Sequence, residues 1–387
     1  MSTPPGARTL RPRALLQILS SRTEDGAPVL LGPNWFASAM GTAIIAVAGA
    51  TLPIALPGIG ALTTLAWALS VAMLALLLVI VPVHWARTPG AVRRLRDDAV
   101  MAQFFGAPPM ALMAVGAATL LVGSHIIGED LAVRIDAVLW AVGTLLGLAT
   151  AVYVPYLLFT QHEVRPDGAF GGWLMPVVPP MVSATTGGLL LRFVPEGQAR
   201  LAMLLGCYAM FGLSLIVSLI VISMIWSRLA HFGSSGSARV PTLWIVLGPV
   251  GQSMTAAGVL GAGAALATPA PLSTAMRLFA VLYGVPMWGF MLLWMALACL
   301  LTLRARRRQM PFALTWWSFT FPIATCVTGT NQLARHTGLV AFEYAAVGLF
   351  ALLVTAWAGV AIGTVLAVAR GELIAPGPGK PVVASKA

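Results

Sequence analysis

The segment TWWSFTFPIATCVTGT, residues 315–330, combines a proline, aromatic rings and hydroxyl groups in an uncharged stretch. From Phe321, steps of four and seven residues reach Thr325 and Thr328, so these side chains share one face of a helix. Hydroxyl groups on such a face can replace the water around a passing solute, and an aromatic ring can close the path by excluding water. The pattern therefore indicates permeation, although an aromatic side chain packed in a helical core would have the same spacing.

Residues that make or break bonds are not grouped. The cysteines, Cys207, Cys299 and Cys326, show no CxxC or Cys/His spacing, so neither a disulfide framework nor a zinc site is indicated. The five histidines fall in loops or at helix ends, where they would not form a haem or redox-metal centre. The sequence contains neither HExxH nor GxSxG. We therefore expect no metal, no cofactor and no enzymatic activity, with a membrane-embedded enzyme as a remote alternative.

Composition predicts that the chain lies in a lipid bilayer. Of its 387 residues, 59% are hydrophobic and 9% are charged, whereas about 25% are charged in an ordinary soluble domain. A helix needs about 20 apolar residues to cross a bilayer. Stretches of this kind predict an all-α integral membrane protein with ten transmembrane helices, near residues 33–52, 62–83, 101–124, 137–159, 171–191, 201–226, 241–267, 278–302, 311–331 and 345–368.

Charge predicts the domain boundaries and the orientation. Residues 1–30 lack the apolar core and cleavage site of a secretory signal and are expected to form a cytoplasmic N-terminal arm. Residues 31–370 would form the ten-helix transport domain, and residues 371–387, rich in Gly and Pro, a disordered cytoplasmic tail. Most basic residues lie in the two ends and in the loops after even-numbered stretches. The positive-inside rule then places both termini in the cytoplasm of a multi-pass protein of the cell (inner or plasma) membrane.

The net charge of +11 is spread over these short loops. A nucleic-acid-binding protein would gather its basic residues on one folded surface. The expected partners are therefore the lipid bilayer and a transported solute, and no nucleic acid.

An internal repeat is the most informative pattern in the chain. In each odd-numbered stretch an aromatic residue precedes a Pro or Gly by five to seven positions, and small residues follow. The five anchors are spaced by 68, 71, 69 and 73 residues, a period that holds two crossings. Repeats that enter the membrane in the same sense are related by an axis along its normal. We expect five helical hairpins in a pseudo-fivefold arrangement around a central pore, with anchors at Gly41, Pro109, Pro180, Pro249 and Pro322.

Helix breakers and hydroxyl groups predict which helices face the pore. Broken backbone at membrane depth is tolerated where it lines a cavity or where neighbours complete its hydrogen bonds. The odd-numbered stretches carry the anchors mid-span with hydroxyl residues behind them, whereas the even-numbered stretches are mostly Leu, Val, Ala and Ile. We expect the anchors to kink the pore-lining helices, Thr325 and Thr328 to line the pore, and Phe321 to form its gate. Close packing through small residues would explain the same pattern on any single helix.

The motifs PNWFASAMGT, WLMPVVPP, LGPVGQ and WWSFTFP, in this order, resemble the tellurite-resistance/dicarboxylate transporter family over residues 30 to 370. That family includes bacterial tellurite-resistance proteins, the yeast malate permease, fungal sulfite-efflux pumps and the slow plant guard-cell anion channel. The resemblance implies a homotrimer in which ten helices of each chain surround its own pore. It also implies a phenylalanine gate on the ninth helix, at Phe321. The first motif is closer to the malate and sulfite branch than to the tellurite branch.

The distribution of charge narrows the solute. All twelve acidic residues fall in loops, tails or near helix ends, whereas cation channels use acidic rings and proton pumps bury carboxylates. Small anions are therefore expected: C4-dicarboxylates such as malate, sulfite, or inorganic anions such as nitrate or chloride. Arginines in the loops opposite the basic side would attract anions, although each would equally anchor a helix at the interface. These are Arg192, Arg200, Arg277 and Arg335.

A second mode of transport is compatible with the same residues. A proton-coupled carrier for dicarboxylates, or for efflux of tellurite or sulfite, needs no buried relay if the substrate carries the proton. The sequence distinguishes neither this carrier from a channel-like conduit nor one anion from another.

Overall fold

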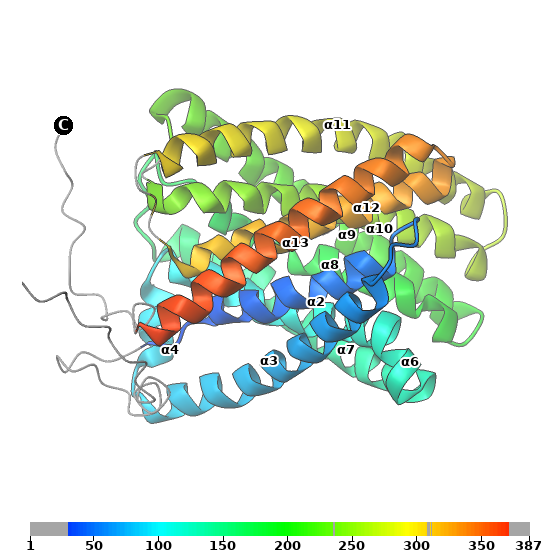
Figure 1. Cartoon of the computed structure of the whole chain (residues 1–387), viewed down its shortest axis with the longest axis horizontal. Coiled ribbons are helices and arrows are strands. Elements are labelled where there is room, and N and C mark those ends of the chain that lie inside the picture. Colours follow the sequence, from blue (N-terminus) through cyan, green and yellow to red (C-terminus); the bar gives the residue numbers. More distant parts are fainter. Residues whose placement is uncertain (1–29, 235–236, 308–309, 311, 371–387) are drawn as a thin grey trace, which may run out of the picture.

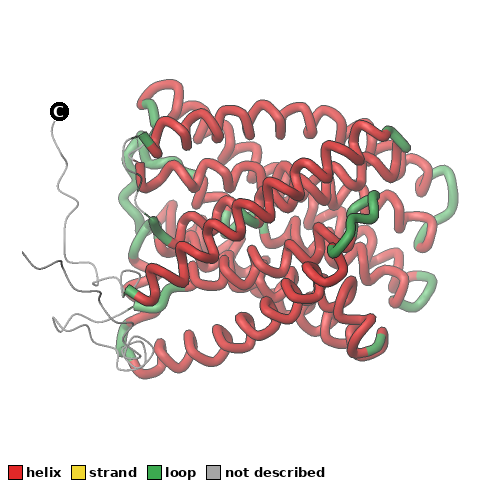
Figure 2. Tube along the Cα trace, in the orientation of Figure 1, coloured by secondary structure: helices red, strands yellow, loops and turns green. Residues whose placement is uncertain are grey.

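Long and short helices alternate along the chain in the computed structural model, which describes residues 30–234, 237–307, 310 and 312–370. The expected arm and tail lie outside these residues, apart from residue 30. The long helices are α3 (Ile59–Arg87), α7 (Glu129–Thr160), α9 (Gln198–Phe232), α11 (Leu272–Arg306) and α13 (Val340–Ala369). The short helices are α2 (Phe36–Ala50), α5 (Ala107–Ala118), α8 (Pro179–Leu190), α10 (Leu247–Gly263) and α12 (Phe321–Thr337). The described residues contain no strand (Figure 2).

The long helices expose apolar side chains over most of their surface. In the most apolar part of each, only 17% to 28% of the residues are buried inside the protein. All five are long and apolar enough to cross a membrane, as are the segments Met101–Ile127 and Arg239–Leu266, which are 72% and 94% buried. The protein is therefore a multi-pass membrane protein. On the same criteria seven described helices qualify rather than the expected ten, because α2, α8 and α12 have only 15, 12 and 17 residues.

Prolines begin the short helices rather than kinking them. All five short helices follow 3₁₀-helical segments, which are η1 (Pro33–Trp35), η2 (Met101–Gly106), η4 (Gly171–Leu174), η6 (Ser237–Val246) and η8 (Leu314–Phe319). The anchors Pro109, Pro180, Pro249 and Pro322 lie in the first turn of α5, α8, α10 and α12. Proline fits there because the first N–H groups of a helix have no intrahelical acceptor.

The anchors were expected to kink the short helices in mid-span, and the structure differs from this expectation in two ways. Interior prolines occur instead in three long helices, at Pro82, Pro155 and Pro286. In the first unit the change from 3₁₀-helix to α-helix comes at Phe36, so Gly41 lies inside the regular helix α2.

Contacts between the helices follow a regular order. Among the short helices, α2 contacts α5, α5 contacts α8, α8 contacts α10, α10 contacts α12, and α12 contacts α2. Each short helix also packs on the long helix that follows it, and each long helix touches the next short helix, with α13 touching α2. This arrangement buries nearly every residue of the short helices. The core of the protein is therefore made by the short helices.

Tryptophan side chains tie long helices to short ones. A buried indole N–H needs an acceptor, and in a membrane protein that acceptor comes from a neighbouring helix. Four long-helix tryptophans donate across to the next unit: Trp67 to Thr119 Oγ1 at 3.0 Å, Trp140 to the Ser183 carbonyl at 2.9 Å, Trp288 to Thr330 Oγ1 at 3.1 Å, and Trp357 to Thr42 Oγ1 at 3.1 Å. The last bond joins the final helix to the first.

Both ends of the described chain lie at the same end of the bundle. Figure 1 shows the first and last described segments near α4 (Ala91–Asp97), whereas α6 (Ser124–Ile127) lies at the opposite end. The long helices run the length of the bundle between these ends.

Candidate functional site

Two cavities lie among the short helices. Each of these five helices, or the segment just before it, contributes lining residues to both cavities. The space between atoms is about 450 Å³ in the first and about 360 Å³ in the second, in each case including space open to the surroundings. On four of the five short helices, a residue that lines the second cavity lies four positions after one that lines the first. Four residues span about 6 Å along a helix. These steps are Met40 to Ile44, Met110 to Ala114, Val178 to Val182 and Gly248 to Gln252. The cavities are therefore stacked along the helix axes.

Phe321 is the one described residue that lines both cavities. It is the first residue of α12, directly after the 3₁₀ segment η8, and it is 3% exposed. A side chain that lines two stacked cavities lies at the boundary between them. The residue predicted to form the gate thus occupies the position at which a ring would interrupt a continuous path.

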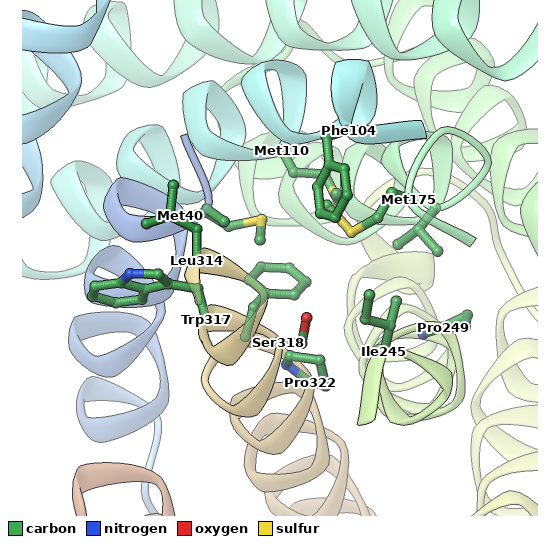
Figure 3. A pocket seen from close by; sticks show the side chains of 14 residues that line it. Met40, Phe104, Met110, Met175, Ile245, Pro249, Leu314, Trp317, Ser318 and Pro322 are labelled. Atoms are coloured by element: carbon green, nitrogen blue, oxygen red, sulfur yellow. The ribbon is translucent and has the colours of Figure 1, made fainter. Parts of the chain in front are cut away.

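The first cavity has an almost entirely apolar wall. Figure 3 shows Met40, Met110, Phe104 and Met175 on one side of it, facing Ile245 and other residues across the space. Methionine side chains are flexible and fill irregular gaps. The hydroxyl group of Ser318 is the polar side-chain group in the lining. Ions therefore meet few hydrogen-bonding groups here.

The second cavity has a polar wall on three of its helices. Its polar lining residues are Thr185, Thr186, Gln252, Thr255 and Thr328. Each is at most 6% exposed. Their side chains are neutral, so the chemistry available in this cavity is hydrogen bonding from hydroxyl and amide groups.

The predicted pore residues divide between the cavities and the packing around them. Pro249 and Pro322 line the first cavity, and Thr328 lines the second. Thr325 lines neither, since its hydroxyl group donates to the Pro322 carbonyl at 2.7 Å and lies 3.2 Å from the Leu247 carbonyl. It therefore fixes the start of α12 against α10.

The other three anchors also lie outside both cavities. A Cβ atom on Gly41 would collide with Thr320 Oγ1 and lie 2.9 Å from a ring carbon of Trp317. Pro109 and Pro180 are buried in helix contacts. Gly41 thus permits close approach of α2 to the segment that precedes Phe321.

None of the four predicted arginines lines a cavity. Arg192 forms an ion pair with Glu129 at 3.0 Å. Arg200 is buried and donates to the Val194 carbonyl at 2.8 and 2.9 Å and to the Leu266 carbonyl at 3.2 Å. Arg335 donates to the Thr51 carbonyl at 3.0 Å, and Arg277 is exposed. The structure thus connects three of these arginines to nearby loop or helix ends.

The sequence matches the SLAC1 (voltage-dependent anion channel) family over residues 31–365. This chain belongs to that family. The resemblance drawn from the four motifs is thereby confirmed, and the members found by comparison are transporters or channels rather than enzymes.

Two relatives with transport names cover most of the chain, and a third covers about half of it. A sulfite efflux pump of Arthroderma otae is 27% identical over 321 residues, which are 80% of this chain and 84% of the pump. An uncharacterized transporter of Methanocaldococcus jannaschii is 24% identical over 341 residues, 88% of this chain and 95% of that protein. A malic acid transport protein of Schizosaccharomyces pombe is 23% identical over 200 residues, 49% of this chain and 44% of that protein.

For a member of an anion channel family, one buried acidic residue was not anticipated. Asp136 is fully buried in α7, and neither carboxyl oxygen has a hydrogen-bond partner among the described residues. Its Oδ1 occupies the space that a side chain on Gly116 of α5 would need. Asp136 lies in the first third of α7, near the helix end as expected, but its burial there was not part of that expectation. Its position on the helix could have indicated this burial, because Asp136 shares a face of α7 with the small residues Ala132 and Gly143, which are also buried.

Metal ligands and thiols are not gathered at either cavity. The described residues contain no group of three or more His, Cys, Asp or Glu side chains placed to hold a metal ion. The three cysteines are free, and Cys207 and Cys326 are buried. The groups lining the two cavities are thus three aromatic rings, aliphatic side chains, thioethers, hydroxyls and one amide.

Proposed function

We propose that this protein transports small anions through a path formed by the two cavities, with Phe321 as its gate. The observation that carries the proposal is the position of Phe321, which lines both of two stacked cavities at the centre of the short helices. A ring at such a boundary excludes water and ions when closed, because a narrow apolar passage is not wetted. Movement of the ring would join the cavities.

The fold that we propose for this path is five helical hairpins in pseudo-fivefold order, giving ten crossings. Its support is the closed sequence of contacts from α2 through α12 back to α2, with one long helix following each short one. The short helices would then form the inner wall and the long helices the lipid-facing surface. An even number of crossings agrees with two chain ends at one end of the bundle. We propose a homotrimer as the assembly, as the motif resemblance implies.

Neutral cavity walls favour weak binding and rapid release of an anion. No lining residue of either cavity carries a charge. A fixed cation would hold an anion tightly, and a ring of carboxylates would select cations instead. Positive residues such as Arg192 and Arg277 would raise the local anion concentration at the end where the long helices begin. The opposite end, where α4 carries Arg93, Arg94 and Arg96, would be cytoplasmic by the positive-inside rule.

Sulfite and malate are the first substrates to examine, because relatives are named for them. Nitrate and chloride are examined next, because the uncharged walls of both cavities do not restrict the solute to one kind of anion. The protein is purified, reconstituted in liposomes and assayed for flux of each anion at an imposed membrane potential, with potassium as the cation control. Anion flux above that of protein-free liposomes is expected. Cation flux equal to anion flux, or no flux of any of the four anions, would contradict the proposal.

A proton-coupled carrier is the second candidate, and Asp136 is the observation that favours it. An ionised carboxylate without a partner is far costlier to bury than a neutral acid, so Asp136 is the residue at which we propose that such a carrier would bind its proton. The elements with the most extensive contacts to α7 (η2, α5, the π-helical segment Thr119–Gly123, α6 and α8) contain no acidic or basic residue apart from the exposed His125. Arg192 forms an ion pair with Glu129 at the exposed start of α7. On α7 itself, Glu129, Asp130 and Arg134 are exposed.

The carrier is tested by imposing a pH gradient across the same liposomes. A carrier would accumulate malate or sulfite against its concentration gradient, and Asp136→Asn would abolish accumulation while leaving downhill flux. A conduit would respond only to voltage and substrate gradients. Accumulation that persists in Asp136→Asn would remove Asp136 from the coupling.

A further inference from the structure

We infer that the second cavity contains an oxyanion-binding site whose recognition group is the side-chain amide of Gln252. The inference rests on the proposed anion path and names the class of ligand that the path selects, a small anion whose oxygens accept hydrogen bonds. Three observations carry it: the level of Gln252 relative to Phe321, the use of the neighbouring hydroxyl protons, and the unpaired amide itself.

Gln252 lies in the layer directly beyond the Phe321 ring. The first cavity contains Gly248 of α10, and the second begins four residues later at Gln252, on the same face of the helix. On α2, α5 and α8, the residues at the corresponding level of the second cavity are Ile44, Ala114 and Val182, which are all aliphatic. An anion that passes Phe321 therefore meets one polar side chain at this level, the amide of Gln252.

The hydroxyl groups around this layer already use their protons. Thr185 donates to the Met181 carbonyl at 3.2 Å, and Thr186 donates to the Val182 carbonyl at 2.9 Å. A hydroxyl group has one proton and two lone pairs. These two threonines accordingly direct lone pairs, rather than protons, at the cavity.

Thr255 and Thr328 share their protons in the same way. Their hydroxyl oxygens are 2.7 Å apart, so one of them donates to the other. The remaining proton goes to a backbone carbonyl, either Gly251 at 3.0 Å from Thr255 or Thr325 at 3.2 Å from Thr328. Neither arrangement leaves a proton for a solute.

The amide of Gln252 is the uncommitted donor in this wall. Its side chain is 3% exposed, lines the cavity and forms no hydrogen bond to any residue that the structure describes. An amide that faces a cavity without a protein acceptor can donate both of its N–H groups to a ligand that enters the cavity. An oxyanion provides acceptors that a weakly accepting halide such as iodide lacks.

The backbone on both sides of Gln252 is held in place. At Gly251, a Cβ atom would lie 2.5 Å from the backbone carbonyl carbon of Thr325, so α10 and α12 are in close contact there. On the other side, the Ser253 hydroxyl donates to the Val250 carbonyl at 2.8 Å and accepts from Tyr283 at 2.7 Å. The amide thus projects from a fixed position, as a selective binding group requires.

The test compares Gln252→Leu with Gln332→Leu. Both replace a buried glutamine with leucine, but Gln332 lines neither cavity. Sulfite and iodide fluxes are measured in liposomes at one voltage. A hydrogen bond to a charged group corresponds to about tenfold in an equilibrium constant, so the sulfite-to-iodide ratio should fall about tenfold in Gln252→Leu and keep its wild-type value in Gln332→Leu. An unchanged ratio in Gln252→Leu would overturn the site while leaving anion transport in place.

Binding is also measured without transport. Sulfite should raise the thermal unfolding temperature of wild-type protein and of Gln332→Leu, because a ligand that binds only the folded state stabilises it, and this shift should be lost in Gln252→Leu. If sulfite does not shift the unfolding temperature of the wild-type protein, the binding site is overturned even if anion flux is seen. If no anion flux is seen, the proposed transport function alone is overturned. If Gln252→Leu does not fold, Gln252→Asn retains the amide on a shorter side chain and should give an intermediate ratio.

Discussion

The hydroxyl oxygens of Thr255 and Thr328 lie 2.7 Å apart across the contact between α10 and α12. Glycines permit this approach, since a Cβ atom on Gly329 would lie 2.8 Å from the Gly251 carbonyl oxygen. Phe321 is two helical turns before Thr328 on the same helix. The close contact of these two helices therefore determines where the ring of Phe321 lies between the cavities.

Replacement of Phe321 by Ala should open the path between the cavities. Loss of the ring removes the apolar barrier at their boundary, and we expect anion flux to rise by about tenfold or more. Flux in liposomes or patches at a fixed voltage gives the measurement.

Phe319→Ala is the matched control. This ring packs against Trp244 and Trp316 with centroid distances of 5.4 and 5.8 Å and lines neither cavity. It should leave flux near the wild-type level. Unchanged flux in a folded Phe321→Ala protein would show that the ring is not a gate.

Replacement of Gly251 by Ala should destabilise the protein. The new Cβ atom would lie 2.5 Å from the carbonyl carbon of Thr325 and 2.6 Å from the amide nitrogen of Cys326, and backbone atoms cannot move aside cheaply. Overpacking of this kind costs about 1–3 kcal/mol. The thermal unfolding temperature in detergent should fall accordingly.

Gly206→Ala controls for the substitution itself. Gly206 lies on α9 with no neighbouring atom within 4 Å of the position a Cβ would take. The change should be neutral or stabilising by up to about 1 kcal/mol, because alanine favours a helix. Equal unfolding temperatures for the two variants would indicate that α10 and α12 can separate without cost.

Sequence reasoning located the helices but not the way each short helix begins. Apolar length and the repeat of about 70 residues predicted a stretch at each of the five short and five long helices, but not the short helix α4 (Ala91–Asp97). The prolines were interpreted as kinks because a proline inside an apolar stretch has the same sequence signature whether it breaks a helix or starts one. Only the preceding 3₁₀ segment, such as Leu314–Phe319 before Pro322, distinguishes the two.

Helical spacing was enough to place Phe321 and Thr328 on a cavity-facing side of α12, whereas their roles stay predictions. It was not enough for residues whose position depends on contacts between helices. Thr325 shares their face, yet its hydroxyl group is used by the backbone of α10. Gln252 was not singled out by the sequence, because its significance depends on which neighbouring protons are already donated. Asp136 was judged by its distance from the helix end, whereas its burial depends on α5 packing beside it.

Two exposed arginines provide a test of electrostatic attraction. Arg277→Gln and Arg335→Gln should lower anion flux about two- to threefold at low ionic strength and have no effect above about 0.15 M salt, because exposed charges act over a Debye length. The measurement is flux against salt concentration at constant anion gradient. A reduction that is the same at all salt concentrations would point to helix anchoring instead.

Arg200→Gln should behave differently. Arg200 is buried and bonded to the Val194 and Leu266 carbonyls, so its loss should lower stability by about 2 kcal/mol. Flux per folded protein should be unchanged. A salt-dependent loss of flux in a stable Arg200→Gln protein would instead assign this arginine to anion attraction.

Replacement of Asp136 by Leu should stabilise the protein or leave its stability unchanged. The carboxyl group is fully buried against Gly116 without a hydrogen-bond partner among the described residues, and an unpaired polar group of this kind costs about 1–3 kcal/mol relative to a paired one. Leucine has the same branching of side-chain heavy atoms, with methyl groups somewhat larger than the carboxyl oxygens, and no such cost. Asp130→Leu, at an exposed position on the same helix, should change stability by no more than about 0.5 kcal/mol. Thermal unfolding of the three proteins gives the comparison. A large loss of stability in Asp136→Leu, with Asp130→Leu unchanged, would mean that the carboxyl group is paired in the membrane and would remove the physical reason for assigning it a proton.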